Sequence, residues 1–147
     1  MLDKITYNPS ERRYEFVDPD SGEIFTAPAK QKHELFKALV GMLEPGLYDA
    51  VHRWLEDEPY LERILWRGAE LAATNGVETF PGEGHLLAMV QSSDAYGRYS
   101  VTIEDGYIVC ECAYFQDGNP PLDVNGQRVC KHVAAFHLHQ RTREDRF

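Results

Sequence analysis

Three cysteines and one histidine near the end of the chain have a spacing that indicates chemistry. Cys110 and Cys112 form a C-x-C pair, and Cys130 and His132 form a C-x-H pair after 17 intervening residues. Thiolate and imidazole are donors that suit Zn²⁺, usually four of them in a tetrahedron. The two pairs therefore predict one Cys₃His site that binds one Zn²⁺ per chain.

Two other interpretations of these residues explain less of the pattern. Three thiols cannot all pair in disulfides, and unrelated buried cysteines would not account for two donor pairs with the same i, i+2 spacing. A catalytic zinc ion usually keeps three protein ligands and a water molecule, whereas four donors complete its shell. The pattern thus favours a structural metal site over a catalytic one.

The segments around the two pairs must bring them together. Strands are expected over residues 85–91, 99–104 and 107–112, with Asp105-Gly106 as a two-residue hairpin turn. Cys110 and Cys112 would project from one face at the end of the last strand. Cys130 should lie at or just before the start of a helix, with His132 in its first turn. Residues 113–129 are rich in turn residues, and we expect the metal to be their main constraint.

This arrangement resembles the SWIM-type zinc finger, in which C-x-C and C-x-H pairs lie on a β-β-α unit. Cys110, Cys112, Cys130 and His132 match all four ligands of that pattern, and the likeness covers about residues 85–140. The resemblance implies a module that binds DNA or proteins and catalyses no reaction. With 147 residues, the chain is expected to be a stand-alone finger protein or an accessory subunit.

The first 80 residues predict a hairpin and a small helical lobe. Residues 13–26 alternate on both sides of a turn at Asp18–Gly22. Apolar residues at helical spacing then predict helices over 29–43, around 47–55, and from Asp57-Glu58-Pro59 to Asn75-Gly76. The fold class is therefore expected to be α+β, with residues 1–80 as an acidic lobe and 81–147 as the zinc-binding unit.

Several side chains of the helices receive ordinary structural interpretations. Trp54 and Trp66 lie at helical spacing and are expected in the core. His137 and His139 are expected on the surface of the last helix, too far along it to share a metal with His132. A solvated helical surface is expected for four carboxylates, Glu44, Glu56, Asp57 and Glu58.

The charge of the chain is unevenly distributed. The total is −9, but the last 20 residues hold five cations and two carboxylates, so they carry +3 and the rest of the chain −12. An acidic chain does not coat nucleic acid by bulk electrostatics. Any contact with DNA or RNA is therefore expected from the C-terminal cations Arg128, Lys131, Arg141, Arg143 and Arg146.

Two classes of function remain open at this point. In one, the finger stabilises the fold and the acidic lobe binds a protein partner; in the other, the basic C-terminal helix binds nucleic acid. The sequence shows no nucleophile motif, phosphate-binding loop or other catalytic setting, so neither an enzyme nor a small-molecule substrate is expected. No apolar run reaches the ~20 residues of a membrane span and no signal peptide is evident, so an intracellular, cytoplasmic protein is expected (nuclear in a eukaryote).

Overall fold

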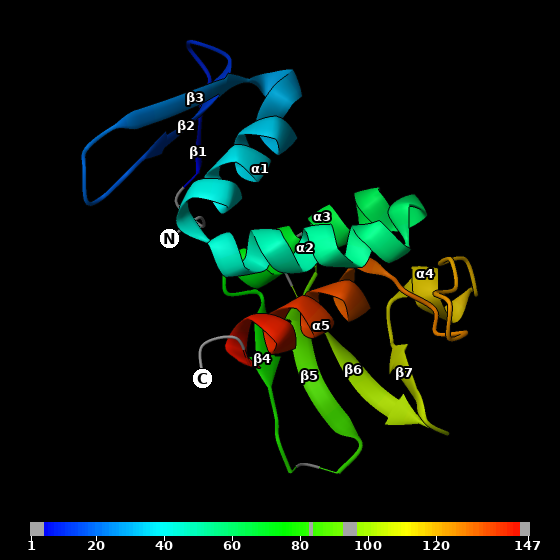
Figure 1. Cartoon of the computed structure of the whole chain (residues 1–147). Coiled ribbons are helices and arrows are strands. Elements are labelled where there is room, and N and C mark those ends of the chain that lie inside the picture. The colour runs from blue at the N-terminus through cyan, green and yellow to red at the C-terminus, as the bar shows by residue number, and fades with distance from the viewer. Residues whose placement is uncertain (1–4, 83, 93–96, 145–147) are drawn as a thin grey trace.

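The computed structural model describes residues 5–82, 84–92 and 97–144, and it shows an α+β protein. A three-stranded sheet is followed by a layer of helices, and a four-stranded sheet lies on the other side of the last helix (Figure 1). Both sheets are antiparallel. The predicted fold class is confirmed. Among the described residues, no helix combines the length and the apolar character that crossing a membrane requires.

The predicted N-terminal hairpin forms and gains a third strand. Strands β2 (Arg13–Val17) and β3 (Ile24–Pro28) pair on both sides of the turn, and β1 (Thr6–Asn8) pairs with the outer edge of β2. The sequence does not reveal β1 because its three residues are polar or exposed and show no alternation. Phe16 is the buried anchor of this sheet, with 1% of its surface exposed.

The three predicted helices are present. They are α1 (Lys32–Leu43), α2 (Pro45–Asp57) and α3 (Glu62–Ala73), with short 3₁₀ turns at Ala29–Gln31 and Pro59–Leu61. The predicted cap after α3 is confirmed, because Asn75 has a left-handed backbone and the Gly76 amide donates to the Leu71 carbonyl at 2.8 Å.

The two tryptophans lie in the core as predicted, but one of the carboxylates does not lie on the surface. Trp54 and Trp66 are 6% and 3% exposed. Glu58 is only 5% exposed, which corrects its assignment to a solvated surface. Its carboxylate accepts hydrogen bonds from Trp54 Nε1 and from the Tyr60 hydroxyl, each at 3.1 Å. These donors make the burial of the charge tolerable.

The second sheet is a four-stranded meander. Its strands are β4 (Val77–Thr79), β5 (Leu86–Gln91), β6 (Arg98–Glu104) and β7 (Tyr107–Cys110). The hairpin between β6 and β7 is confirmed, since Asp105 and Gly106 both have positive φ, as a tight two-residue turn requires. Two details of the prediction are wrong: Thr79 ends a strand where a loop was expected, and β7 stops at Cys110 where it was expected to reach Cys112.

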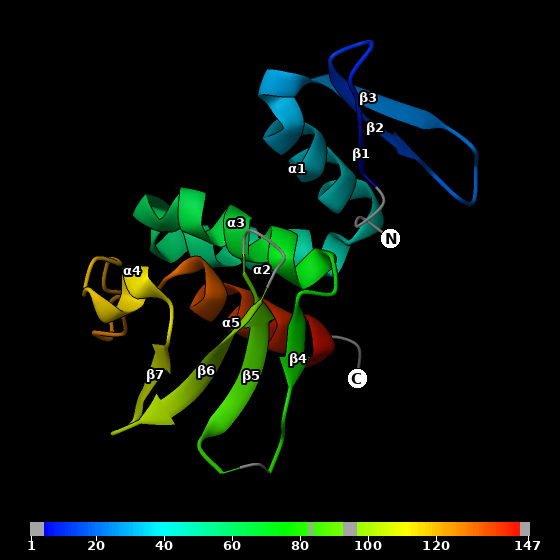
Figure 2. The ribbon, with the colours of Figure 1, turned by 180° about the vertical axis from the view of Figure 1, so that it is seen from behind.

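The last helix, α5 (Lys131–Glu144), lies between the helical layer and the second sheet (Figures 1 and 2). Ala134 and Leu138 belong to the core formed with α1–α3, whereas Val133, Ala135 and Phe136 belong to the core formed with the sheet. Burial on two sides explains the apolar run at residues 133–136.

A close approach between α3 and α5 holds these layers together. A Cβ atom at Gly68 would lie 2.8 Å from the Ala134 Cβ and 2.9 Å from the Ala135 nitrogen. Only glycine fits there without a shift of one helix. The division of the chain near residue 80 stays a prediction; in the structure β4, on the earlier side of that boundary, pairs with β5 on the later side.

Candidate metal centre

The four predicted ligands converge in the structure. One donor atom from each of Cys110, Cys112, Cys130 and His132 lies within 4.8 Å of every other. All four residues are buried, with exposed fractions of 0%, 5%, 1% and 3%. A tetrahedron with metal–sulfur bonds of about 2.3 Å has edges of about 3.8 Å. The spacing of the four donors is therefore close to that of a coordination shell, and the group could hold one metal ion.

Cys110 and Cys112 come from the end of β7 and the residue before the single-turn helix α4 (Ala113–Gln116). The Cys112 amide points at the Cys110 Sγ at 3.5 Å, and the Cys110 carbonyl accepts a hydrogen bond from Gln116 Nε2 at 2.7 Å. Amide N–H groups directed at sulfur stabilise a thiolate. The strand end thus presents both thiols to one point although Cys112 lies outside the strand.

Cys130 and His132 come from the start of α5. Cys130 precedes the first helical residue, as predicted, and its carbonyl accepts the Ala134 amide at 2.9 Å. Its Sγ accepts the Val133 amide at 3.4 Å, so the thiol occupies the place of an N-capping oxygen. The positive end of the helix dipole favours negative charge on this sulfur.

The crowded thiols alter one another's acidity. A hydrogen bond with Cys112, a second with Cys130, and burial raise the pKa of Cys110. The hydrogen bond with Cys110 lowers the pKa of Cys112. For Cys130, the hydrogen bond with Cys110 acts to lower the pKa, but the hydrogen bond with Cys112 and burial outweigh it and raise the pKa to about 11. Three buried thiols at this distance need a neutralising cation before all of them can ionise.

His132 places one imidazole nitrogen beside the thiols. Its Nδ1 lies 3.9 Å from the Cys130 Sγ, and its Nε2 is buried without a hydrogen-bond partner among the described residues. Leaving a buried polar atom unsatisfied costs about 1–3 kcal/mol. Nδ1, the nitrogen beside the Cys130 sulfur, is the candidate metal ligand, and the unpaired Nε2 is not itself evidence for the metal.

The segment between the two pairs is better fixed than the sequence suggests. Gln127 pairs with the edge of β7: its Oε1 accepts the Ile108 amide at 2.8 Å and its Nε2 donates to the Ile108 carbonyl at 2.7 Å. Asp123 Oδ1 accepts the amides of Asn125 and Gln127. The expectation that a metal is the main constraint on residues 113–129 is therefore wrong. The Gln127 side chain hydrogen-bonds to β7 as a neighbouring strand would, and Asp123 holds the turn that precedes it.

Comparisons with other proteins bring no further assignment. No protein-family model, curated protein or solved structure matches the chain. The case for a metal therefore depends on the donor atoms, their burial and their spacing.

Three of the five C-terminal cations, Arg128, Lys131 and Arg141, have described side chains, and these have different surroundings. Arg128 donates to the Pro120 carbonyl at 2.8 Å, and the Arg141 guanidinium lies over the Trp54 ring, 4.6 Å from its centroid. Lys131 lines a pocket beside the metal ligands. Arg143 lies in the last turn of α5, and Arg146 lies outside the described residues. Arg128 and Arg141 thus make contacts within the protein.

The predicted surface position of His137 is also corrected. Its ring packs edge-on against Trp54 and beside Phe136, with centroid distances of 5.7 Å to both. Burial, followed by the charge of Arg141, lowers the pKa of His137. His137 lies four residues before Arg141 on α5, and both side chains contact Trp54. This i, i+4 spacing is the feature of the sequence that could have indicated the position of His137.

The sequence interpretation also missed Arg63 and Arg67. Both are exposed residues of α3 and line the same pocket as Lys131, Cys112, Cys130 and His132. Their i, i+4 spacing places them on one helix face. That signal is legible in the sequence, but nothing in the sequence shows that this face lies beside the metal ligands.

Proposed function

We propose that this protein is a non-catalytic interaction module whose C-terminal unit is a SWIM-type zinc finger. Cys110, Cys112, Cys130 and His132 would hold one structural Zn²⁺. The observation that carries this proposal is the convergence of four buried donors within 4.8 Å of one another. The strand–loop–helix order of the ligands supports the SWIM assignment.

The donor set supports zinc as the ion. Three thiolates and one imidazole form a soft, compact set that suits tetrahedral Zn²⁺, whereas Mg²⁺ and Ca²⁺ prefer oxygen ligands. Bound Zn²⁺ would leave the centre with a charge of about −1. The start of α5 and the side chain of Lys131 would offset this charge. Reduced thiols in such a site also support an intracellular location.

A structural role for the ion is supported by the closure of the site. A catalytic zinc needs a position for water or substrate. Here each ligand residue is at most 5% exposed, and four donors complete the tetrahedron. The module would therefore act by binding a macromolecular partner, as an accessory subunit or on its own.

Metal analysis of a matched histidine pair tests the proposal. Protein purified from zinc-supplemented medium should contain one zinc per chain by mass spectrometry of the metal. The His132→Asn variant should lose most of it, whereas His139→Asn, seven residues further along α5, should keep it. Wild-type protein without zinc, or equal zinc in both variants, would overturn the proposal.

A further inference from the structure

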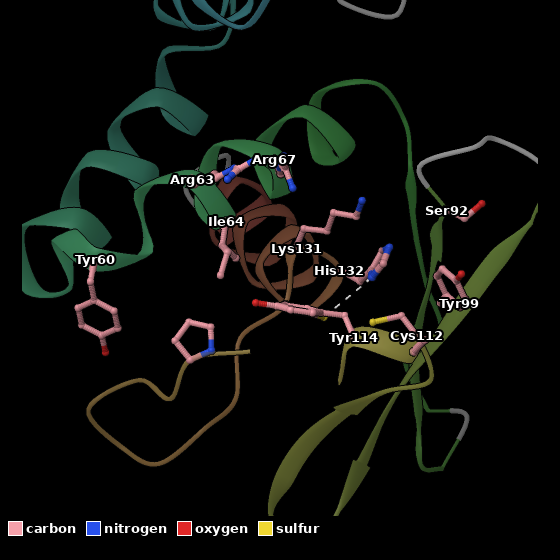
Figure 3. A pocket seen from close by; sticks show the side chains of 13 residues that line it. Tyr60, Arg63, Ile64, Arg67, Ser92, Tyr99, Cys112, Tyr114, Lys131 and His132 are labelled. Carbon is pink, nitrogen blue, oxygen red and sulfur yellow. Dashed lines mark hydrogen bonds between the residues drawn. The ribbon is translucent and has the colours of Figure 1, made fainter. Parts of the chain in front are cut away.

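A pocket of about 730 Å³ lies beside the proposed metal centre, where α3, the first turn of α5 and α4 meet (Figure 3). We call it the α3–α5 groove and define it by Arg63, Arg67, Tyr99, Tyr114, Lys131 and His132. Its volume falls within the range of pockets that hold ligands, roughly 300–1,000 Å³. The metal centre forms one wall, so a ligand assigned to this groove rests on the proposed function.

Cationic side chains gather along one side of the groove. Figure 3 shows Arg63, Arg67 and Lys131 on that side, and no carboxylate lines the groove among the described residues. This grouping contrasts with the net charge of −9 for the whole chain. Like charges one helical turn apart on α3 destabilise the helix slightly. Their clustering is therefore better explained by an external anion than by folding.

The acidic residues of α3 do not neutralise its arginines. Glu62 pairs with Lys37 at 3.6 Å, and Glu70 pairs with Lys32 at 3.5 Å, so both carboxylates are engaged with α1. Within the part of the chain that the structure describes, Arg63 and Arg67 have no ion-pair partner. Helix α3 thus directs its carboxylates to the protein and its guanidinium groups to the groove.

Aromatic rings provide the opposite side. Tyr114 is 46% exposed and lies across the groove from the cations (Figure 3). Tyr99 packs edge-on against the His132 ring, with 4.9 Å between their centroids. An exposed ring in the same pocket as two guanidinium groups provides two kinds of contact, one for a flat apolar group and one for an anion.

We propose that the α3–α5 groove binds single-stranded nucleic acid, with Arg63 and Arg67 contacting phosphates and Tyr114 stacking on a base. Planar guanidinium groups match phosphate oxygens, and an aromatic platform beside a cationic track is the usual means of binding a single strand. An acidic peptide would use the cations but leave the Tyr114 ring without a partner. A duplex would bring its phosphates to the surrounding surface of an acidic protein.

The proposal is tested by fluorescence anisotropy with labelled oligothymidine and oligouridine of about 15 nucleotides, at about 50 and 200 mM salt. The full chain, purified from zinc-supplemented medium, is used throughout. The double variant Arg63→Glu/Arg67→Glu should bind at least about tenfold more weakly, and the log–log salt slope should flatten by about 1.4. The exposed pair Arg12→Glu/Lys30→Glu provides the charge-matched control and should bind almost as wild type does.

Two further variants locate the surface that binds the strand. Tyr114→Ala should weaken binding about 5- to 150-fold, whereas Tyr7→Ala, at a similarly exposed ring on β1, should not. The triple variant Arg141→Glu/Arg143→Glu/Arg146→Glu tests the C-terminal helix and should retain binding. Loss of affinity in this triple variant but not in the groove pair would overturn the proposal.

Competition identifies the ligand. Unlabelled oligothymidine should displace the probe at far lower concentration than thymidine monophosphate or polyglutamate of equal charge. If thymidine monophosphate displaces the probe at the same concentration as oligothymidine, the groove is a nucleotide pocket. If polyglutamate does so, the ligand is an acidic protein. Either result overturns the single-strand proposal. Zinc is measured in the same samples: zinc-loaded protein that does not bind overturns only this inference, whereas zinc-free protein that binds overturns only the proposed function.

Discussion

The two faces of α5 contact two differently built cores. On the side of α2 and α3, the helix joins a core that contains large apolar side chains such as Phe36, Leu39, Leu65 and Trp66, each at most 3% exposed. Towards the second sheet, the buried residues other than the cysteines are mostly alanine and valine: Ala88, Val90, Val101, Val133, Ala135 and Phe136. Three buried thiols make up the remainder of this smaller core.

This difference indicates how each side is stabilised. Burying a large aliphatic or aromatic side chain contributes about 1.5–3 kcal/mol, so the helical core gains most of its stability from the hydrophobic effect. The sheet side has fewer and smaller apolar groups. A structural zinc ion can contribute on the order of 10 kcal/mol of apparent binding free energy, which would compensate for the small core. We therefore expect metal dependence on one face of α5 and packing dependence on the other.

The largest effect is expected from Cys130→Ser. In the proposed zinc centre, loss of this ligand would remove metal binding worth on the order of 10 kcal/mol, and it also removes the thiol that caps α5. The zinc content and the midpoint temperature of thermal unfolding should both fall. The rate of hydrogen exchange should rise more in β5–β7 than in α1–α3. The matched control is Ala135→Ser, which adds a hydroxyl to the same core at a position without a ligand. Equal zinc content in the two variants would contradict this expectation.

A smaller effect is expected from Leu65→Ala on the helical side. Leu65 has no exposed surface, and truncation of a buried leucine costs about 2–5 kcal/mol. The free energy of unfolding in urea should fall by that amount while one zinc per chain is retained. Met42→Ala, at a side chain 58% exposed, should change stability by less than about 0.5 kcal/mol. Loss of zinc from folded Leu65→Ala protein would show that the two cores do not differ in this way.

Gly68→Ala tests the contact between the two regions. The added methyl would lie 2.8 Å from the Ala134 Cβ, and the resulting shift of α3 or α5 costs about 1–3 kcal/mol. Gly41→Ala on α1 is the control, because its new Cβ would lie 3.4 Å from the Tyr48 ring, and alanine favours the helix by up to about 1 kcal/mol. Chemical denaturation should show the first variant destabilised and the second unchanged or stabilised. Equal stability of both variants would mean that α3 and α5 are not tightly packed at Gly68.

The smallest effect concerns the pH dependence of the helical side. Burial lowers the pKa of His137 in the folded state, with a further contribution from Arg141 that Asp123 partly opposes. The unfolded state therefore binds a proton more readily, so stability is present above the ordinary histidine pKa of 6.5 and decreases as the pH falls below it. In His137→Gln, the decrease in unfolding free energy between about pH 7 and 5.5 should be smaller than in the wild type. Zinc content is followed in parallel, and an identical pH slope with equal zinc would contradict the assignment.

Local patterns made much of the fold predictable, and the places where prediction failed share a physical cause. Apolar spacing identifies the three helices, and Asp105-Gly106 identifies a hairpin whose backbone only a few residue types adopt. By contrast, β1 and β4 are three residues long, so too few side chains alternate to reveal them. Glu58 is buried by hydrogen bonds from Trp54 and Tyr60, and Gln127 is held by the backbone of Ile108. Their residue types alone suggest exposure to solvent.

The candidate site divides in the same way. The spacing of Cys110, Cys112, Cys130 and His132 predicts a shared site because the two residues of each pair are close in sequence and both are donors that suit a metal ion. The α3–α5 groove could not be predicted, because Arg63 and Tyr114 are separated by some fifty residues and line one pocket only where α3, α4 and the start of α5 meet. Local chemistry is legible in the sequence, whereas a surface assembled from several elements is not.

The central claim, a closed structural Cys₃His zinc centre, is tested most directly by X-ray absorption at the zinc edge of the purified protein. We predict one zinc per chain with three sulfur neighbours at about 2.3 Å, one nitrogen at about 2.0 Å and no oxygen ligand. A shell that contains water, or fewer than three sulfurs, would contradict it.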